Sequence, residues 1–395
     1  MGEWRECTLG ELCTDISYGY TASASQEENG PKFLRITDIV PDRINWETVP
    51  YCSIDDNKQE KYTLEIGDIV IARTGATTGY NKLITKNINA VFASYLIRYK
   101  INSEIANPSY VAYNLQSYEW KGFVEGIIGG SAQPGANAKQ FASFNFFLPH
   151  LEEQSAIADV LSSLDDKIDL LHRQNKTLEE LAQTLFRQWF IEEARDEWEV
   201  VKLDDILTIT SSKRVFYSEY VSNGVPFYRS KEIIELHNTG QTKSELYISE
   251  DRYNEIVDKF GPVVSGDILL TSVGTLGIPY RVNQDDRFYF KDGNLTWFKD
   301  FTKLPSLIIL YWLKSDIGKE ELDAIAIGST QAALTINSLK SIQLALPPID
   351  IINKLEEQLI VIDNKLQANL KQIKTLENMR DTLLPKLMSG EVRVK

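Results

Sequence analysis

Residues 157–189, IADVLSSLDDKIDLLHRQNKTLEELAQTLFRQW, decide the fold because apolar residues recur in them at alternating steps of four and three. Nine of the ten positions on this spacing are apolar, whereas the chain's hydrophobic content of 43% would place about four there by chance. These positions are Ile157, Leu161, Leu164, Ile168, Leu171, Asn175, Leu178, Ala182, Leu185 and Trp189. The spacing predicts one helix of a coiled coil, whose apolar stripe needs a partner to cover it.

The same pattern returns near the end of the chain, with eight apolar members among ten. The second series is Leu355, Leu359, Ile362, Leu366, Asn369, Ile373, Leu376, Arg380, Leu383 and Leu387. Two such helices in one chain most simply cover each other, so we predict a coiled coil between them. Pro385 is expected to end the second helix before Leu387, because proline cannot donate a helical hydrogen bond.

A pseudo-twofold arrangement of the two copies would make the helix pair antiparallel. Full antiparallel overlap of the two series then places Asn175 opposite Asn369. An Asn inside a coiled-coil core lowers stability and selects the register, because its amide needs a partner across the seam. We therefore predict that these two residues pair; the alternative is that each occupies a splayed, partly hydrated position.

The sequence outside the helices is also duplicated, at an offset of about 198 residues. Matching segments are 33–35 and 227–229, 66–69 and 265–268, 130–133 and 328–331, and 148–149 and 346–347. A period this long indicates a duplicated domain and not a solenoid repeat. We expect a globular domain at 1–150, a helix at 151–196, a second globular domain at 197–349 and a second helix at 350–395.

Each globular half is predicted to mix strands with helices. Strands are expected at 32–37, 68–73, 90–99 and 143–148, and in the second copy at 225–230, 267–272, 288–298 and 341–346. A helix is expected to begin near Pro108, with Asn107 as its N-cap, and its counterpart near Pro305. The fold class is therefore α+β, with two similar domains joined by an antiparallel coiled coil.

The charge balance constrains any binding of nucleic acid. The chain carries a net charge of -14, and affinity for the phosphate backbone depends on clustered Lys and Arg. Residues 1–150 hold 13 basic and 17 acidic side chains, and residues 197–349 hold 16 and 21. Residues 151–196 hold 5 and 11, and residues 350–395 hold 8 and 7. Binding to DNA would need cations gathered on one face, or partner proteins that neutralise the phosphates.

Composition and motifs also exclude several classes of protein. No run of eighteen apolar residues is present, and the acidic opening does not resemble a signal peptide. The cysteines lack a Cys-x-x-Cys pair, which favours reduced thiols in a cytoplasmic protein over a disulfide or zinc site. They are Cys7, Cys13 and Cys52.

Catalytic and metal residues are not expected in this chain. Its only histidines, His150, His172 and His237, cannot build a His-based active site in both copies. The adenine-methyltransferase tetrapeptide of Asn or Asp, two prolines and an aromatic residue is also missing. A duplicated chain without such residues indicates a module for recognition and assembly.

Two glycine loops, at 75–79 and 274–277, follow equivalent strands. No Gly-Lys-Ser/Thr follows them, which disfavours a nucleotide site, so they are either simple tight turns or loops that project side chains toward DNA. The Gly-Ser-x-Gln segments are equally suited to base contacts and to plain loops or helix caps. The DNA-contact candidates are Arg35, Arg73, Thr74, Thr77, Thr78, Tyr80, Ser131 and Gln133 in the first copy, and Lys213, Arg229, Lys231, Thr271, Ser272, Thr275, Arg281, Ser329 and Gln331 in the second.

The alternation of globular unit, Leu-Pro leader and heptad helix, present twice, resembles the specificity subunits of Type I restriction-modification enzymes. Residues 148–154, LPHLEEQ, are similar to that family's Leu-Pro-Pro-Leu-x-Glu-Gln leader, and the Gly-Asp-Ile and Gly-Ser-x-Gln segments resemble its target recognition domains. The chain departs from the pattern at His150 and at residues 350–352, where the usual Glu-Gln is lost.

The resemblance implies a non-catalytic subunit of a host-defence system, in which each domain reads one half of a split, asymmetric DNA site. The helices then act as the spacer, since about 33 residues at ~1.5 Å each span ~50 Å. The resemblance further implies two modification subunits, which use S-adenosylmethionine to methylate adenine, and restriction subunits, which use ATP and Mg. The acidic face of residues 151–196 is a candidate docking surface for the modification subunits, or a merely solvated face.

Two other functions compete with this interpretation. A fused DNA methyltransferase would bind S-adenosylmethionine without partners. A stand-alone coiled-coil scaffold would bind proteins or sugars and would not retain duplex DNA selectively. The bases read by each domain do not follow from the sequence, because base contacts depend on irregular loops and on DNA deformation.

Overall fold

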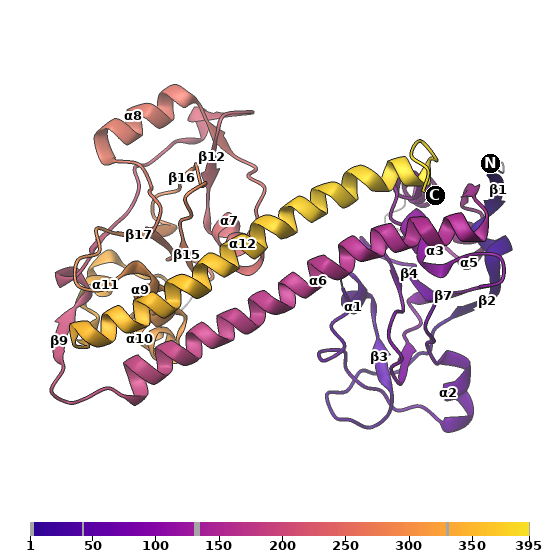
Figure 1. Ribbon diagram of the computed structural model, residues 1–395, viewed down its shortest axis with the longest axis horizontal. Helices are drawn as coiled ribbons and strands as arrows, with labels where there is room; N and C mark the ends of the chain where they lie inside the picture. The colour runs from indigo at the N-terminus through magenta and orange to yellow at the C-terminus, as the bar shows by residue number, and fades with distance from the viewer. Residues whose placement is uncertain (1–3, 42, 130–134, 329–331, 395) are drawn as a thin grey trace. The chain divides into compact units, whose positions relative to one another are not determined.

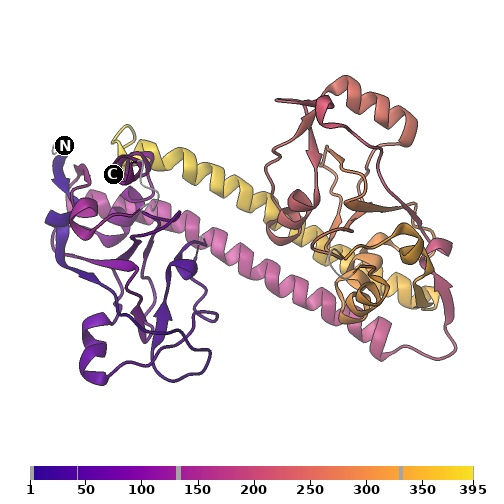
Figure 2. The ribbon, with the colours of Figure 1, turned by 180° about the vertical axis from the view of Figure 1, so that it is seen from behind.

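The computed structural model describes residues 4–41, 43–129, 135–328 and 332–394. Figures 1 and 2 show its ribbon from opposite sides. The chain forms two compact units: unit 1 comprises Met1–Leu170 with Ile373–Lys395, and unit 2 comprises Leu171–Gln372. Each unit therefore contains one globular domain and a part of both long helices.

The globular domain of unit 1 is built on a four-stranded antiparallel sheet of order β2-β7-β4-β5 (Figure 1). The strands of this sheet are β2 Cys13–Tyr18, β7 Leu96–Ile101, β4 Asp68–Ala72 and β5 Asn81–Leu83. All five residues of β4 are buried, because both faces of the sheet are covered. Two short pairs complete the strands: β3 Lys32–Leu34 runs parallel to β6 Ala90–Phe92, and β1 Arg5–Thr8 runs antiparallel to β8 Asn145–Leu148.

The same domain has five short α-helices: α1 Ile36–Ile39, α2 Asp56–Tyr62, α3 Pro108–Asn114, α4 Tyr118–Ile128 and α5 Ala138–Ala142. The predicted cap of α3 is confirmed, since the Asn107 side chain accepts hydrogen bonds from the amides of Ser109 and Tyr110. Apolar residues of α3 and α4 pack with Ile157 and Leu161 in one core. The heptad stripe is thus covered in part by the domain itself.

Unit 2 repeats this plan, with a four-stranded antiparallel sheet of order β10-β17-β14-β15. Its strands are β10 Thr208–Thr210, β17 Leu295–Lys299, β14 Ile268–Thr271 and β15 Pro279–Arg281. A second sheet has the order β11-β13-β12-β16, formed by β11 Tyr220–Val221, β13 Tyr247–Ile248, β12 Val225–Tyr228 and β16 Tyr289–Phe290, and β9 Glu199–Lys202 pairs with β18 Gln343–Leu346. The shorter helices are α7 Ser230–Thr239, α8 Glu250–Phe260, α9 Ser306–Lys314, α10 Asp316–Ile325 and α11 Ile336–Ser341.

The strands predicted at 90–99 and 288–298 are each two strands in the structure. In unit 1 the chain leaves β6, which pairs with β3, and enters β7, which pairs with β2 and β4. A turn separates them, in which the Leu96 amide donates to the Ala93 carbonyl at 2.8 Å. In unit 1 the sequence gives little sign of the break, because both strands are buried and mostly apolar, whereas in unit 2 the turn residues KDGN at 291–294 mark it.

The long helices are α6, Leu151–Arg187, which continues as a π-helical turn through Glu192, and α12, Ile349–Met388. The prediction that Pro385 ends the second helix before Leu387 is wrong, because Pro385 lies inside α12. Leu387 and Met388 are buried in the core of unit 1. This burial offsets the hydrogen bond that the proline cannot make.

The helices run antiparallel in each unit, as predicted. In unit 1, Arg380 of α12 pairs with Asp165 of α6 at 3.1 Å, and Arg393 beyond α12 pairs with Glu153 near the start of α6. In unit 2, the Lys354 ammonium of α12 lies 6.0 Å from the ring centroid of Trp189. Later residues of α12 therefore meet earlier residues of α6.

The heptad positions of both helices are all buried or half-buried. In unit 2, Nδ2 of Asn369 donates to Oδ1 of Asn175 at 2.8 Å. Asn369 is only 1% exposed, whereas Asn175 is half-buried. The two residues meet across the seam as the antiparallel overlap predicts, and their role in selecting the register stays a prediction.

Candidate functional site

The loop that follows β4 is held in place by main-chain hydrogen bonds. The Arg73 amide donates to the Tyr95 carbonyl at 3.0 Å, and the Arg73 carbonyl accepts from the Ala136 amide at 2.9 Å. Further along the loop, Gly79 has a φ of 89°, and a Cβ there would lie 2.7 Å from Cγ1 of Val124. The loop therefore needs glycine at this position, and it fixes Arg73 at the end of the strand.

The Arg73 side chain stacks on the ring of Tyr18, the last residue of β2. The guanidinium carbon lies 4.9 Å from the ring centroid, a distance typical of a cation-π contact. The ring is itself held, because the Tyr18 hydroxyl accepts the Ala138 amide at 3.0 Å. Tyr18, Tyr80 and Tyr95 are 41%, 49% and 61% exposed. An arginine and three accessible tyrosines thus belong to the ends of β2 and β4 and the loops beside them.

Several other basic side chains of the first domain are paired with carboxylates, although Lys32 and Lys61 lie over tyrosine rings instead. The pairs are Arg35 with Asp38, Arg43 with Asp169, Lys58 with Asp55, Arg98 with Asp15 and Lys100 with Glu65. Among the described residues, no carboxylate pairs with Arg73, and its buried Nε has no hydrogen-bond partner. Arg73 therefore differs from these neutralised cations.

Unit 2 has the same main-chain frame with different side chains. The Ser272 amide donates to the Asn294 carbonyl, and the Ser272 carbonyl accepts from the Leu334 amide, both at 2.9 Å. Thr271 lies opposite Leu295 in β17, just as Ala72 lies opposite Leu96 in β7. Ser272 is therefore the counterpart of Arg73.

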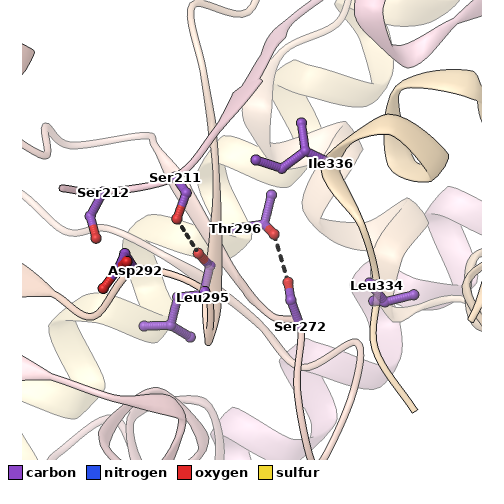
Figure 3. Close-up of a pocket in the computed structure, with 9 residues that line it drawn as sticks. Ser211, Ser212, Ser272, Asp292, Leu295, Thr296, Leu334 and Ile336 are labelled. Carbon is purple, nitrogen blue, oxygen red and sulfur yellow. Dashed lines mark hydrogen bonds between the residues drawn. The ribbon is translucent and has the colours of Figure 1, made fainter. Parts of the chain in front are cut away.

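Small side chains leave a hollow in unit 2 at this position, drawn in Figure 3. It has a volume of about 220 Å³ and is lined by Ser211, Ser212, Ser272, Asp292, Gly293, Leu295, Thr296, Leu334 and Ile336. Continuing the pairing of β10 with β17 places Ser211 opposite Thr296, the place that Tyr18 takes opposite Ile97 in unit 1. Two serines thus replace the Tyr18 and Arg73 stack.

Hydroxyl groups give the hollow a polar wall (Figure 3). Ser211 Oγ donates to the Leu295 carbonyl at 3.1 Å, and the hydroxyl oxygens of Ser272 and Thr296 lie 2.6 Å apart. Oγ of Ser212 is buried without a hydrogen-bond partner among the residues that the structure describes. Asp292 adds a carboxylate, which pairs with Arg214 at 3.2 Å.

The loop candidates of unit 1 differ in accessibility. Tyr80 is exposed, while Thr74 and Thr77 are half-buried and Thr74 forms a β-bridge with Gly135. Thr78 is 8% exposed and its hydroxyl donates to the Gly75 carbonyl at 2.7 Å. The Thr78 hydroxyl thus stabilises the turn and does not project from it.

Three loop candidates of unit 2 do not project toward solvent as predicted. Thr271 is fully buried and its hydroxyl accepts the Ile278 amide, while the Ser272 hydroxyl contacts Thr296. Arg281 lies on β15 and pairs with Asp363 of α12 at 3.1 Å. These groups are engaged inside unit 2, whereas Thr275 is exposed.

Arg35 and Arg229 form a duplicated structural motif at the start of α1 and α7. Each guanidinium donates to the carboxylate three residues later, Asp38 or Glu232. The same carboxylate also accepts the backbone amide of that arginine. These hydrogen bonds raise the pKa of both arginines. An acid at the third following residue is a signal that the sequence does contain.

The remaining basic candidates of unit 2 are both exposed. Lys231 pairs with Glu245, which also pairs with Arg229. The Lys213 ammonium lies 5.0 Å from the ring centroid of Phe260. The last four candidates, Ser131, Gln133, Ser329 and Gln331, lie outside the described residues.

Tyr18, Tyr95 and the serines at 211 and 212 are not among the sequence candidates. One signal was available at Gly19, which follows Tyr18 directly in the sequence. A Cβ there would lie 2.2 Å from the Ala93 carbonyl oxygen. Glycine at that point lets the chain pass close to the segment before β7, which brings Tyr18 beside Arg73.

The described part of the chain contains no group of three His, Cys, Asp or Glu residues that could hold a metal ion. Burial raises the pKa of Cys7 to about 11 and that of Cys13 to about 12, so both thiols are protonated at neutral pH. Across the same residues, the structure has no helix that is both long and apolar enough to span a bilayer.

Comparison with known proteins gives consistent similarities. The chain matches the Type I restriction modification DNA specificity domain at residues 1–180 and again at 195–378. The Type I restriction enzyme MjaVIII specificity subunit of Methanocaldococcus jannaschii is 26% identical over 358 residues, which cover 83% of this chain and 80% of that protein. The HindI specificity subunit of Haemophilus influenzae is 21% identical, with 99% of this chain and 100% of that protein covered.

A solved structure is similar along nearly the whole chain. The Type I restriction-modification S subunit from M. genitalium superposes with a TM-score of 0.63 and 16% sequence identity, covering 98% of this chain and 96% of the other. At this identity the likeness concerns the fold alone. It extends to both globular domains and both long helices.

Proposed function

Because the chain belongs to the Type I restriction modification DNA specificity family, whose domain it contains twice, we propose that each globular domain reads one half of a bipartite DNA site. The resemblance inferred from the sequence is thereby confirmed. The chain is a DNA-sequence specificity subunit of a Type I restriction-modification system.

The observation that carries this proposal is one main-chain frame with two sets of side chains. Arg73 and Tyr18 in unit 1 correspond to Ser272 and Ser211 in unit 2. A conserved backbone presents the side chains at matched positions, and base edges are distinguished by the donors and acceptors offered to them. Two domains that share a backbone but present different side chains are suited to read two different DNA half-sites.

We further propose that two modification subunits, carrying S-adenosylmethionine, and restriction subunits, using ATP and Mg, join this chain on DNA. Such partners would supply phosphate contacts that a chain of net charge -14 does not offer. The coiled coil would set the spacing between the two domains.

The coiled-coil helices offer a docking surface of mixed character. Acidic residues of α6 are partly neutralised within each unit, since Asp165 pairs with Arg380 and Glu179 pairs with Lys314. Exposed apolar side chains also lie on the two helices, and Ile360 and Val361 are neighbours that together offer apolar surface to a protein partner. The exposed apolar residues are Leu151, Leu170 and Met379 in unit 1, and Leu181, Ile349, Ile360 and Val361 in unit 2.

A domain exchange tests the proposed function. Residues 1–150 are replaced by the corresponding domain of another family member, and the chimera is expressed with its modification subunits. Methylation sequencing should show a change in one half of the modified site only. A change in both halves, or in neither, would contradict the proposal, as would S-adenosylmethionine binding by the isolated chain.

A further inference from the structure

We propose that Arg73 reads a guanine in the half-site bound by the first domain, with its guanidinium held in place by Tyr18. This inference rests on the proposed function, since it requires that the first domain contacts DNA. It goes further by naming the residue and the base. A guanidinium fork matches O6 and N7 of guanine, which are adjacent acceptors in the major groove.

The arginine is fixed before any ligand arrives. Its main chain is bonded on both sides, to Tyr95 and to Ala136, and its side chain stacks on a Tyr18 ring that is held through its own hydroxyl. A side chain already confined to one orientation loses little conformational freedom on binding. Such confinement suits directional readout of a base edge better than contact with a phosphate, which any exposed cation can make.

The unsatisfied hydrogen-bonding capacity of Arg73 points to an external acceptor. Its Nε is buried without a partner, and no carboxylate in the described part of the chain pairs with it. Arg98, in the neighbouring strand β7, also has a buried Nε without a partner, but its other two nitrogens are bonded to Asp15 and to the Thr63 carbonyl. A half-buried cation without such partners is costly unless a ligand supplies acceptors.

The surroundings of Arg73 also fit a base and not an isolated anion. The side chains of Tyr80 and Tyr95 are 49% and 61% exposed. Tyr80 lies in the loop that follows Arg73 in the sequence, and the Tyr95 carbonyl accepts the Arg73 amide. Aromatic rings offer broad apolar contact to bases, sugars and the thymine methyl group. These rings would exclude water from around the guanidinium, which strengthens its hydrogen bonds.

The second domain provides an internal control for this inference. At the corresponding position it has Ser272 and the hollow of Figure 3, with no arginine among the lining residues that the structure describes. A change at Arg73 should therefore alter the half-site of the first domain and leave the other half unchanged.

The test uses the full chain assembled with its modification subunits, and compares the wild type with Arg73→Ala, Arg73→Lys and the matched control Ser272→Ala. Methylation sequencing reports the modified site, and duplex retention is measured at several salt concentrations. In Arg73→Ala, one guanine position of one half-site should lose its preference by about 5- to 150-fold, the range expected for one bidentate base contact. Arg73→Lys should restore affinity but not the full preference.

Three results would overturn the inference. A wild-type half-site without guanine on either strand excludes it directly. Uniform weakening on all sequences, with a smaller salt dependence and an unchanged site, would show a phosphate contact instead. An unchanged site and affinity in Arg73→Ala would show no contact at all. If even the wild-type complex modifies DNA without sequence preference, the proposed function itself fails.

Discussion

The two globular domains keep the same buried aspartate and give it different partners. Asp68 is the first residue of β4 in unit 1, and Asp267 directly precedes the equivalent strand β14 in unit 2. Each accepts the amide three residues earlier, at 2.9 and 3.0 Å. In the strand alongside, Nη1 of Arg98 lies 4.0 Å from Oδ2 of Asp68, whereas Trp297 donates its indole N–H to Asp267 at 2.8 Å.

The difference shows which part of the duplicated domain is constrained. The glycines before these aspartates, Gly67 and Gly266, have φ values of 95° and 96°, so the turn and its carboxylate acceptor belong to the shared backbone. The side chain in the adjacent strand needs only to supply a donor, and it differs between the copies. The strand ends follow the same rule, with Arg73 in one copy and Ser272 in the other.

Removing the partner of each buried aspartate, Arg98 for Asp68 and Trp297 for Asp267, should cause the largest losses of stability. The losses should also differ most between the two units. Arg98→Met removes the guanidinium 4.0 Å from the carboxylate of Asp68, which is 1% exposed, and also the 2.8 Å pair with Asp15; a broken buried pair typically costs about 3–5 kcal/mol. Trp297→Phe removes one donor while the Val264 amide remains, which costs about 1–3 kcal/mol. Hydrogen exchange of residues 68–72 and 268–271 measures the local opening free energy in each unit.

In each variant the equivalent strand of the other unit serves as the control, because its amides should keep their protection from hydrogen exchange. Equal losses in both strands from one substitution would show that the units do not open independently. A smaller loss for Arg98→Met than for Trp297→Phe would contradict the ion-pair argument. Burial raises the pKa of Asp68, so proton uptake by this carboxyl limits the loss at acidic pH.

The sequence predicts the repeated scaffold well, because the heptads and the Gly-Asp-Ile and Leu-Pro segments recur at matched spacing. It fails at Pro385, since the burial of Leu387 comes from a domain that begins the chain. It also cannot separate a hydroxyl that bonds a backbone amide, as in Thr271, from one that reaches solvent. Tyr18 was missed because its position beside Arg73, 55 residues later in the sequence, depends on strand pairing.

Substitutions in the Asn175–Asn369 pair should change stability less. One substitution should lower the stability, and substitution of both residues should raise it. Asn175→Leu alone removes the 2.8 Å acceptor of Asn369, which is 1% exposed and keeps only Oε1 of Gln174 at 3.5 Å, and a buried amide left so poorly paired costs about 1–3 kcal/mol. Replacing both Asn residues with Leu removes this cost and raises thermal stability, while the register loosens. Thermal unfolding reports the stability, and the distance distribution between spin labels at Lys176 and Ala368 of unit 2 reports the register.

The matched seam substitution in unit 1 is Arg380→Leu. Asp165 keeps the Tyr113 hydroxyl at 2.7 Å, and Arg380 is 31% exposed in its side chain, so the loss should stay below about 1 kcal/mol.

If Asn175→Leu alone is neutral, the Asn pair does not select the register. A double variant with an unbroadened label distance would lead to the same conclusion.

The smallest expected difference between the copies is a pH effect confined to unit 2. Helix α1 has four residues, whereas its counterpart α7 has ten and includes His237, whose Nδ1 lies 2.7 Å from the Pro279 carbonyl oxygen. Burial, and next the charge of Lys314, lower the pKa of His237 below its ordinary value of 6.5. The folded state therefore binds fewer protons than the unfolded state in the window just below pH 6.5.

Stability of α7 should consequently fall as the pH is lowered through 6.5, and level off once the pH is below the folded-state pKa of His237. Hydrogen exchange of residues 230–239, compared between pH 7.5 and pH 5.5 after correction for intrinsic exchange, measures this loss. His237→Asn should abolish the dependence, because its amide can still donate to the Pro279 carbonyl but does not titrate. The control His172→Asn, at an exposed position of α6, should retain the dependence, and an unchanged slope in His237→Asn would assign the effect to other groups.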